Sequence, residues 1–87
     1  MNTAILSHGD VITAKQDFFL YDKEFMYSRC DVVNKGSVLF IVSVKQKEGY
    51  TSLTLCVLSS ELKKLGWIHI ASRDYFNENF SVLAPTP

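Results

Sequence analysis

Residue types suited to nucleophilic catalysis occur in two sets. The segment Ser7–Asp10 holds a serine, a histidine and an aspartate, and Cys30 or Cys56 could use His69 as a base. A nucleophile needs a base that is itself oriented by a third group, and nearly adjacent side chains are rarely held in that way. We therefore interpret Ser7–Asp10 as a capped turn and both cysteines as small core residues.

The histidines and cysteines do not show the spacing of a metal site. His8, His69, Cys30 and Cys56 are far apart in the sequence, with neither a CxxC nor an HxxxH motif, so the sequence predicts no metal ion. The cysteines could form one disulfide. We favour two buried, reduced thiols, because no secretion signal precedes them.

Other catalytic patterns are missing as well. Asp22 and Glu24 have the spacing of two side chains on one face of a strand, but we interpret them as solvated loop acids rather than as a general acid–base pair. No glycine-rich phosphate loop occurs. We expect no enzymatic activity and no cofactor.

Four lysines could form a basic patch if a hairpin tip and a later turn lie close together: Lys45, Lys47, Lys63 and Lys64. With Tyr50 and Trp67 nearby, such a patch could contact nucleic acid. However, nine basic residues are balanced by nine acidic ones, so the chain as a whole does not attract nucleic acid or an anionic membrane. Nucleic-acid binding is therefore an alternative, and solvated charges are the favoured interpretation.

The size and composition indicate one small folded domain over residues 1–87. The chain has 87 residues, of which 47% are hydrophobic and 13% aromatic. This is too short for a second core and too apolar for a disordered chain. The first residues lack the features of a signal peptide, and the longest apolar run, Val38–Val42, is too short to span a membrane.

These residues must be positioned by strands, because helical periodicity is almost absent. Short β-branched and aromatic runs alternate with turn residues. Asn34-Lys35-Gly36 is typical of a turn, and the alternation in the run that follows predicts a central strand. The expected strands are 11–14, 18–21, 37–45, 50–58, 67–71 and 80–84, with an irregular extended segment at 25–33.

The segment Ser59–Gly66 resembles a short helix, with a serine cap, an early glutamate, late lysines and a final glycine. We expect one short helical turn near residues 60–65. Residues 1–17 are expected to form an N-terminal strand extension and residues 85–87 a frayed tail. The fold class predicted is all-β, a small barrel of five to six short antiparallel strands.

Four motifs occur in a particular order: Leu20-Tyr21-Asp22 with Glu24, Lys35-Gly36 followed by Leu39, Ile41 and Val42, Gly66-Trp67-Ile68, and Ser72 to Tyr75. Their order and spacing resemble the SH3 domain and the SH3-like modules of bacteria and phages, over about residues 20–76. The resemblance implies an SH3-like barrel. Small standalone modules of this kind resemble bacterial or phage proteins, so we expect such a source. Because no signal peptide or membrane-spanning run is visible, we expect a cytoplasmic location, which is the host cytoplasm if the protein is phage-encoded.

The resemblance does not extend to the groove that binds polyproline in the eukaryotic SH3 domain. The tryptophan after the central hairpin loop is replaced by Tyr50-Thr51, the second tyrosine by Lys23, and the proline by His69. Only Tyr21 and Tyr75 match that groove, so the walls that clamp a polyproline helix are mostly missing.

The aromatic residues are more numerous than a small core needs, so some should lie on the surface and mark an interface. We expect a non-enzymatic binding module whose protein or peptide partner contacts Tyr21, Tyr50, Trp67 and Tyr75, with His69 at the rim. The alternatives are the nucleic-acid-binding barrel described above and a self-associating structural protein. We expect no membrane partner.

Overall fold

The computed structural model describes residues 6–24, 29–46 and 52–83. Within them, seven strands and one helix follow each other along the chain. These are β1 (Val11–Ala14), β2 (Phe18–Tyr21), β3 (Cys30–Val33), β4 (Val38–Gln46), β5 (Leu53–Ser59), β6 (Lys64–Ile70), α1 (Arg73–Asn79) and β7 (Phe80–Val82).

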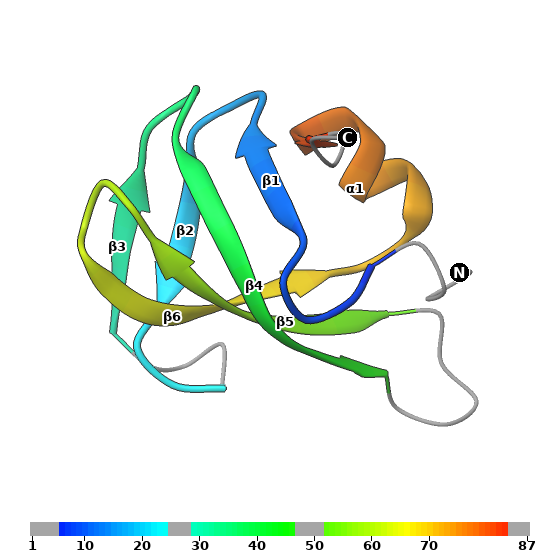
Figure 1. Ribbon diagram of the computed structural model, residues 1–87, viewed down its shortest axis with the longest axis horizontal. Coiled ribbons are helices and arrows are strands. Elements are labelled where there is room, and N and C mark those ends of the chain that lie inside the picture. The colour runs from blue at the N-terminus through cyan, green and yellow to red at the C-terminus, as the bar shows by residue number, and fades with distance from the viewer. Residues whose placement is uncertain (1–5, 25–28, 47–51, 84–87) are drawn as a thin grey trace.

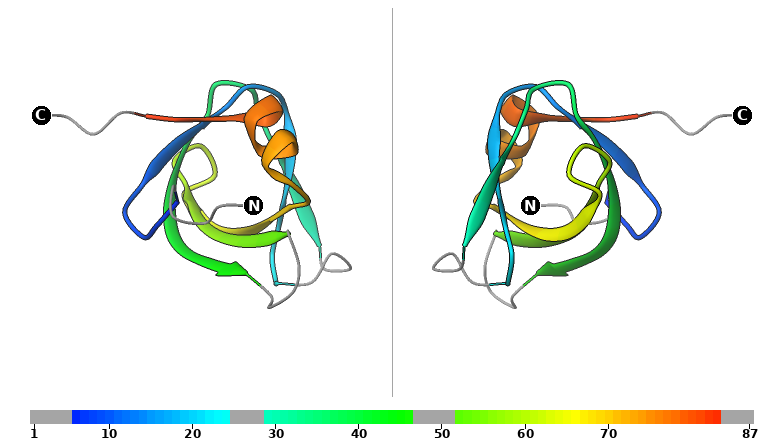
Figure 2. Two further views of the ribbon diagram at one scale, coloured as in Figure 1. Left: turned by 90° about the vertical axis from the view of Figure 1, so that its right-hand side faces the viewer. Right: turned by 90° about the vertical axis from the view of Figure 1, so that its left-hand side faces the viewer.

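The strands form one antiparallel sheet in the order β3-β2-β6-β5-β4-β1-β7. The sheet curls around its own apolar face into a half-barrel (Figures 1 and 2), and α1 packs against β6 and β7. The predicted all-β class is therefore confirmed, with seven strands in the described ranges rather than five to six. The predicted central strand, β4, indeed lies inside the sheet, between β5 and β1.

The core follows the alternation seen in the sequence. Leu53, Leu55 and Val57, at alternate positions of β5, face inward and are almost completely buried. Residues on one face of the sheet are covered by the curl, and the buried side chains form a single cluster. It contains Leu6, Ile12, Ala14, Phe18, Leu20, Val33, Leu39, Ile41, Leu53, Leu55, Val57, Ile68, Ile70, Phe76 and Phe80.

The N-terminal extension contributes to this core. β1 pairs with β4 on one side and with β7 on the other, and Ile12 is fully buried. The turn Asn34-Lys35-Gly36 also forms as predicted, with Gly36 at φ 90, where a residue without Cβ is favoured.

The main correction concerns the helix. Residues 60–63 form one tight turn, in which the Lys63 amide donates to the Ser59 carbonyl and the Leu62 amide donates to Ser59 Oγ. Lys63 then adopts a left-handed conformation (φ 56), and β6 begins directly at Lys64. The residues that resembled helix caps therefore form a single turn between β5 and β6. Gly66 lies within β6 rather than at the end of a helix.

The helix of the described residues is α1, which lies between two expected strands where the sequence predicted no helix. Its first turn is fixed by Ser72, whose Oγ accepts a hydrogen bond from the Tyr75 amide at 3.1 Å. Phe76 is buried and stacks on Phe80 with ring centroids 5.5 Å apart. One capping serine and one buried phenylalanine therefore hold a helix too short to show periodicity. No helix in the described part of the chain is long and apolar enough to cross a bilayer.

Candidate functional site

A groove of about 360 Å³ lies where β2 separates from β6. Figure 1 shows the two strands crossing at a wide angle, and in the described ranges their ladder consists of the pair Tyr21–Trp67. Beyond this pair the two strands diverge, and side chains line the opening between them. We call this opening the β2–β6 groove; it is lined by Asp17, Phe18, Phe19, Tyr21, Val32, Ile68, His69 and Tyr75.

The floor and the rim of the groove come from opposite faces of the strands. Phe18 and Ile68 point toward the core and are 8% and 3% exposed, so they form an apolar floor. Phe19 and Val32 face outward on β2 and β3, directly opposite each other, and are 56% and 52% exposed. Because neighbouring residues of a strand point to opposite faces, one short strand supplies both parts of the groove.

Tyr75 reaches the groove from α1. The Ser72 cap sets where the helix begins, and burial of Phe76 sets which side faces the core. Tyr75, the preceding residue, is 38% exposed and lines the groove opposite the strands. Its ring and hydroxyl are therefore available for contact with a ligand.

His69 forms another wall and is held by two contacts. Its ring meets Tyr21 edge to face with centroids 5.5 Å apart, and its Nδ1 lies 3.5 Å from Thr54 Oγ1. Burial lowers the pKa of His69 below its ordinary value, with a smaller opposing effect of Glu24. The imidazole is therefore neutral at physiological pH and acts mainly as a flat, weakly polar wall.

The histidine does not activate a cysteine. Burial raises the pKa of the Cys56 thiol, and the charge of Glu24 raises it further. A reactive pair needs the reverse shifts, a thiolate stabilised by a protonated imidazole. Both cysteines are free; Cys56 is buried as expected, whereas Cys30 is exposed because it lies on the edge strand β3 and faces outward.

The other catalytic candidate is a turn. The Asp10 carboxylate accepts a hydrogen bond from the Ser7 amide at 2.8 Å, and the Asp10 amide donates to the Ser7 carbonyl at 3.1 Å. This is the capped turn favoured by the sequence. No group of three or more potential metal ligands gathers in residues 6–24, 29–46 and 52–83.

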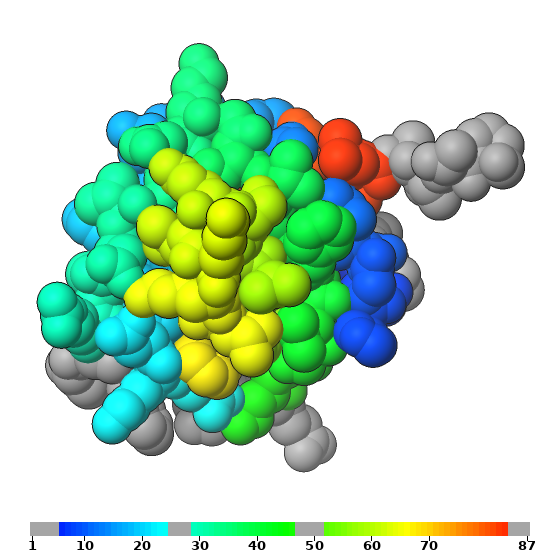
Figure 3. Space-filling view, turned by 60° about the vertical axis from the view of Figure 1, so that its left-hand side comes forward, coloured from blue at the N-terminus to red at the C-terminus, as the bar shows by residue number. Residues whose placement is uncertain are grey.

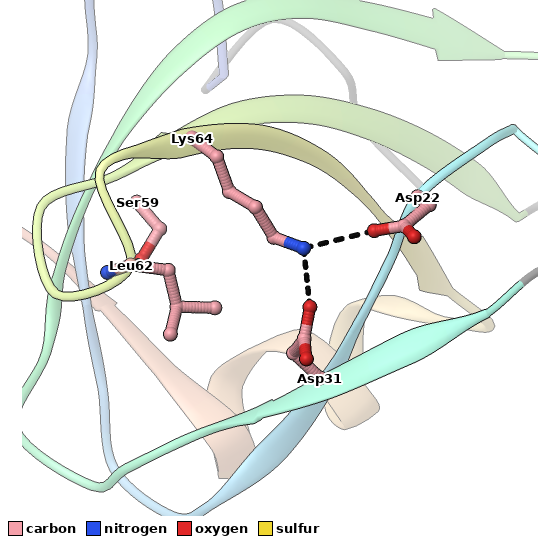
Figure 4. Close-up of polar contacts among 5 residues, drawn as sticks. All are labelled: Asp22, Asp31, Ser59, Leu62 and Lys64. Atoms are coloured by element: carbon pink, nitrogen blue, oxygen red, sulfur yellow. Dashed lines mark hydrogen bonds and ion pairs between the residues drawn. The ribbon is translucent and has the colours of Figure 1, made fainter.

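Two of the four lysines of the predicted basic patch, Lys45 and Lys64, are paired with acids. Lys64 Nζ lies 2.9 Å from Asp22 Oδ1 and also contacts Asp31 (Figure 4), while Lys45 Nζ lies 2.8 Å from Glu24 Oε1. The Asp31 hydrogen bond raises the pKa of Lys64, and Lys64 in turn lowers the pKa of Asp31. Each of these two ammonium groups is therefore opposed by at least one carboxylate.

The sheet register also keeps the lysines apart. Lys45 lies opposite Thr54, and Lys64 lies opposite Ser59, five residues further along β5. At about 3.3 Å per residue, the two lysines are offset by roughly 17 Å along the strand direction. Lys63 is exposed in the turn before β6, and Lys47 lies outside the described residues.

The structure thus gathers three of the five predicted partner-binding residues, Tyr21, His69 and Tyr75, around one groove. Trp67 is half-buried beside the groove, between Tyr21 and Cys56 in the sheet register. Tyr50 lies outside the described residues.

Five lining residues were missed from the sequence: the two floor residues, Phe18 and Ile68, and three others, Asp17, Phe19 and Val32. Phe19 could have been found, because it alternates with Leu20 in a strand whose other apolar residues belong to the core. Val32 could not, since its place depends on pairing with Phe19.

A second apolar surface lies on the outer face of the sheet. Phe40, Leu58 and Leu65 are directly opposite one another on β4, β5 and β6, and each is at least 40% exposed. Figure 3 shows β6 (yellow) at the centre of a face that also carries β4 (green) and the β2–β3 hairpin (cyan to teal). We call these three side chains the outer row.

No protein family model, curated protein or solved structure matches this chain.

Proposed function

We propose that this protein is a binding module that holds a protein or peptide partner in the β2–β6 groove. The observation that supports it best is the exposure of Phe19, Val32 and Tyr75 around a buried apolar floor. Leaving such side chains in water is unfavourable, at about 25 cal/mol per Å² of apolar surface. A partner that covers them recovers this free energy.

The chemistry of the groove fits recognition rather than catalysis. Aromatic side chains supply large, rigid contact area at a low entropic cost, and the tyrosine hydroxyls can still form hydrogen bonds at the rim. Burial raises the pKa of the Cys56 thiol, which disfavours the thiolate that nucleophilic attack would need. The groove volume suits one or two partner side chains rather than a large substrate.

The test uses matched phenylalanine variants. Peptides are selected with the folded chain from a random linear library displayed on yeast, and their affinity is measured by isothermal titration calorimetry. Phe19→Ala should weaken binding by about tenfold or more, the effect of a central interface residue. Phe40→Ala removes a similarly exposed phenylalanine from the outer row and should leave affinity unchanged.

Circular dichroism should show both variants folded, because both side chains are largely exposed. Failure to enrich any peptide, or equal affinities for wild type and Phe19→Ala, would contradict the proposed function.

A further inference from the structure

We propose that the partner binds as an added β-strand along the outer edge of β3, with one of its side chains covering Val32 and Phe19 at the rim of the β2–β6 groove. This inference rests on the proposed function and specifies the partner as an extended peptide segment. It is carried by the direction of the backbone groups of β3.

The register shows which β3 residues point their backbone toward the edge. The Asp22 amide donates to the Arg29 carbonyl at 2.8 Å, so this pair is of the hydrogen-bonded type. Hydrogen-bonded and non-hydrogen-bonded pairs alternate along an antiparallel ladder. Cys30, opposite Tyr21, and Val32, opposite Phe19, are therefore non-hydrogen-bonded pairs. Their N–H and C=O groups point away from β2.

That edge is unpaired among the described strands. β3 is the first strand in the sheet order, so its only neighbour there is β2. Two N–H and two C=O groups thus face outward from Cys30 and Val32, and they form the hydrogen-bonding pattern of one further strand.

Two of the devices that usually block an edge, proline and lysine, are absent from β3. Its sequence, Cys30–Val33, has no proline and no lysine, and both residues with outward backbone groups carry small, uncharged side chains. The acid within it, Asp31, is already bound by Lys64. The opposite edge, β7, is shorter, with three residues, and lies away from the groove lining.

Side-chain geometry connects this edge to the groove. Val32 and Phe19 are directly opposite on adjacent strands, and side chains of non-hydrogen-bonded pairs approach closely. A third strand beside β3 would place its own side chain next to Val32 on the same face, about 5 Å further out. A large apolar residue at that position would cover Val32 and reach Phe19, so an extended segment contacts the edge and the groove rim together.

The test separates backbone pairing from side-chain contact at one position. Val32→Pro removes an N–H that points outward, a position where an edge strand tolerates proline. Val32→Ala keeps that N–H and removes most of the side chain. With the peptides selected above, we expect Val32→Pro to weaken binding by about tenfold or more and Val32→Ala to weaken it less.

A second measurement needs no variant of the protein. N-methylation of the peptide backbone at successive positions should abolish binding at every second residue, because only alternate N–H groups face β3. Unchanged binding of Val32→Pro, or equal tolerance of N-methylation at all positions, would overturn strand addition. If Phe19→Ala still loses affinity in that case, the proposed function stands without it.

The same edge could instead pair with a second copy of the chain. Light scattering distinguishes the two occupants: the peptide model expects the unliganded wild type and Val32→Pro to have the same mass. A wild-type dimer that Val32→Pro converts to a monomer would overturn the peptide model.

Discussion

Gly66→Ala should destabilise the fold because β6 crosses Leu20 at very short range. A Cβ at position 66 would lie 2.3 Å from Leu20 Cγ and 2.7 Å from both Cδ atoms, whereas carbon atoms in contact prefer about 3.5–4.0 Å. Leu20 is fully buried and cannot turn outward. Overpacking of this kind costs typically 1–3 kcal/mol, occasionally more, so we expect a loss of about 2–4 kcal/mol.

The assay is urea unfolding followed by tryptophan fluorescence, since Trp67 neighbours the site of change. Gly36→Ala is the control for the steric clash: the Cβ added at Gly36 meets nothing within 4 Å, although Gly36, unlike Gly66, lies at a positive φ of 90. Its cost should be the backbone penalty alone, roughly 1–2 kcal/mol. For a domain of this size, each kcal/mol corresponds to a fall of about 4–8 °C in Tm.

A double-mutant cycle identifies the cause. Leu20→Ala alone should cost about 2–5 kcal/mol by leaving a cavity. In Gly66→Ala/Leu20→Ala the new methyl group fills part of that cavity, so the double variant should be more stable than the sum of the single effects by about 1–3 kcal/mol. Leu20→Ala and Gly36→Ala should be additive. Additivity within about 0.5 kcal/mol for the Gly66 pair would refute the steric explanation.

Two further predictions follow from titratable groups. The Ser37 hydroxyl and the Asn34 amide donate to Glu61 and lower its pKa, so the bonds stabilise the fold above the ordinary pKa of 4.5 and are lost as pH falls below it. The Tm difference between wild type and Glu61→Gln should therefore shrink on acidification; a constant difference would contradict this. Iodoacetamide should label exposed Cys30 well before Cys56, whose thiol is buried with a raised pKa; equal rates by mass spectrometry would contradict it.

Much of the fold was predictable because apolar and more polar residues alternate along the strands. β5 alternates buried Leu53, Leu55 and Val57 with more polar residues, and this alternation is set by local geometry. The helix was not predictable, since α1 has one buried residue, Phe76, and so shows no periodicity. The sequence signal for this helix was Ser72 as a cap with Asp74 in the first turn.

Glu61 was interpreted as part of a helix, but its carboxylate instead accepts hydrogen bonds from Asn34 in the turn between β3 and β4. The resemblance to the SH3 family stays a prediction.

Several residues of the candidate site were predictable from the sequence, but the position of the groove was not. Tyr21, His69 and Tyr75 were expected at one surface, and the structure places them around one groove. Where the groove lies depends on β2 leaving β6 after a single pair, Tyr21–Trp67. That divergence results from the curl of the whole sheet and from α1, and neither is encoded in a short segment.

Phe18 and Phe19 are neighbours on β2, but Phe18 belongs to the core and Phe19 to the exposed rim of the groove. Phe18 is 8% exposed and packs edge to face on Phe80, with centroids 5.1 Å apart. Phe19, the next residue, is 56% exposed and contributes nothing comparable to the core. Both line the same groove, so under the proposed function replacing either should reduce binding, but only the loss of Phe18 would also open a cavity in the core. The groove can therefore change its specificity at Phe19 and Val32 while its floor, and with it the fold, stays the same.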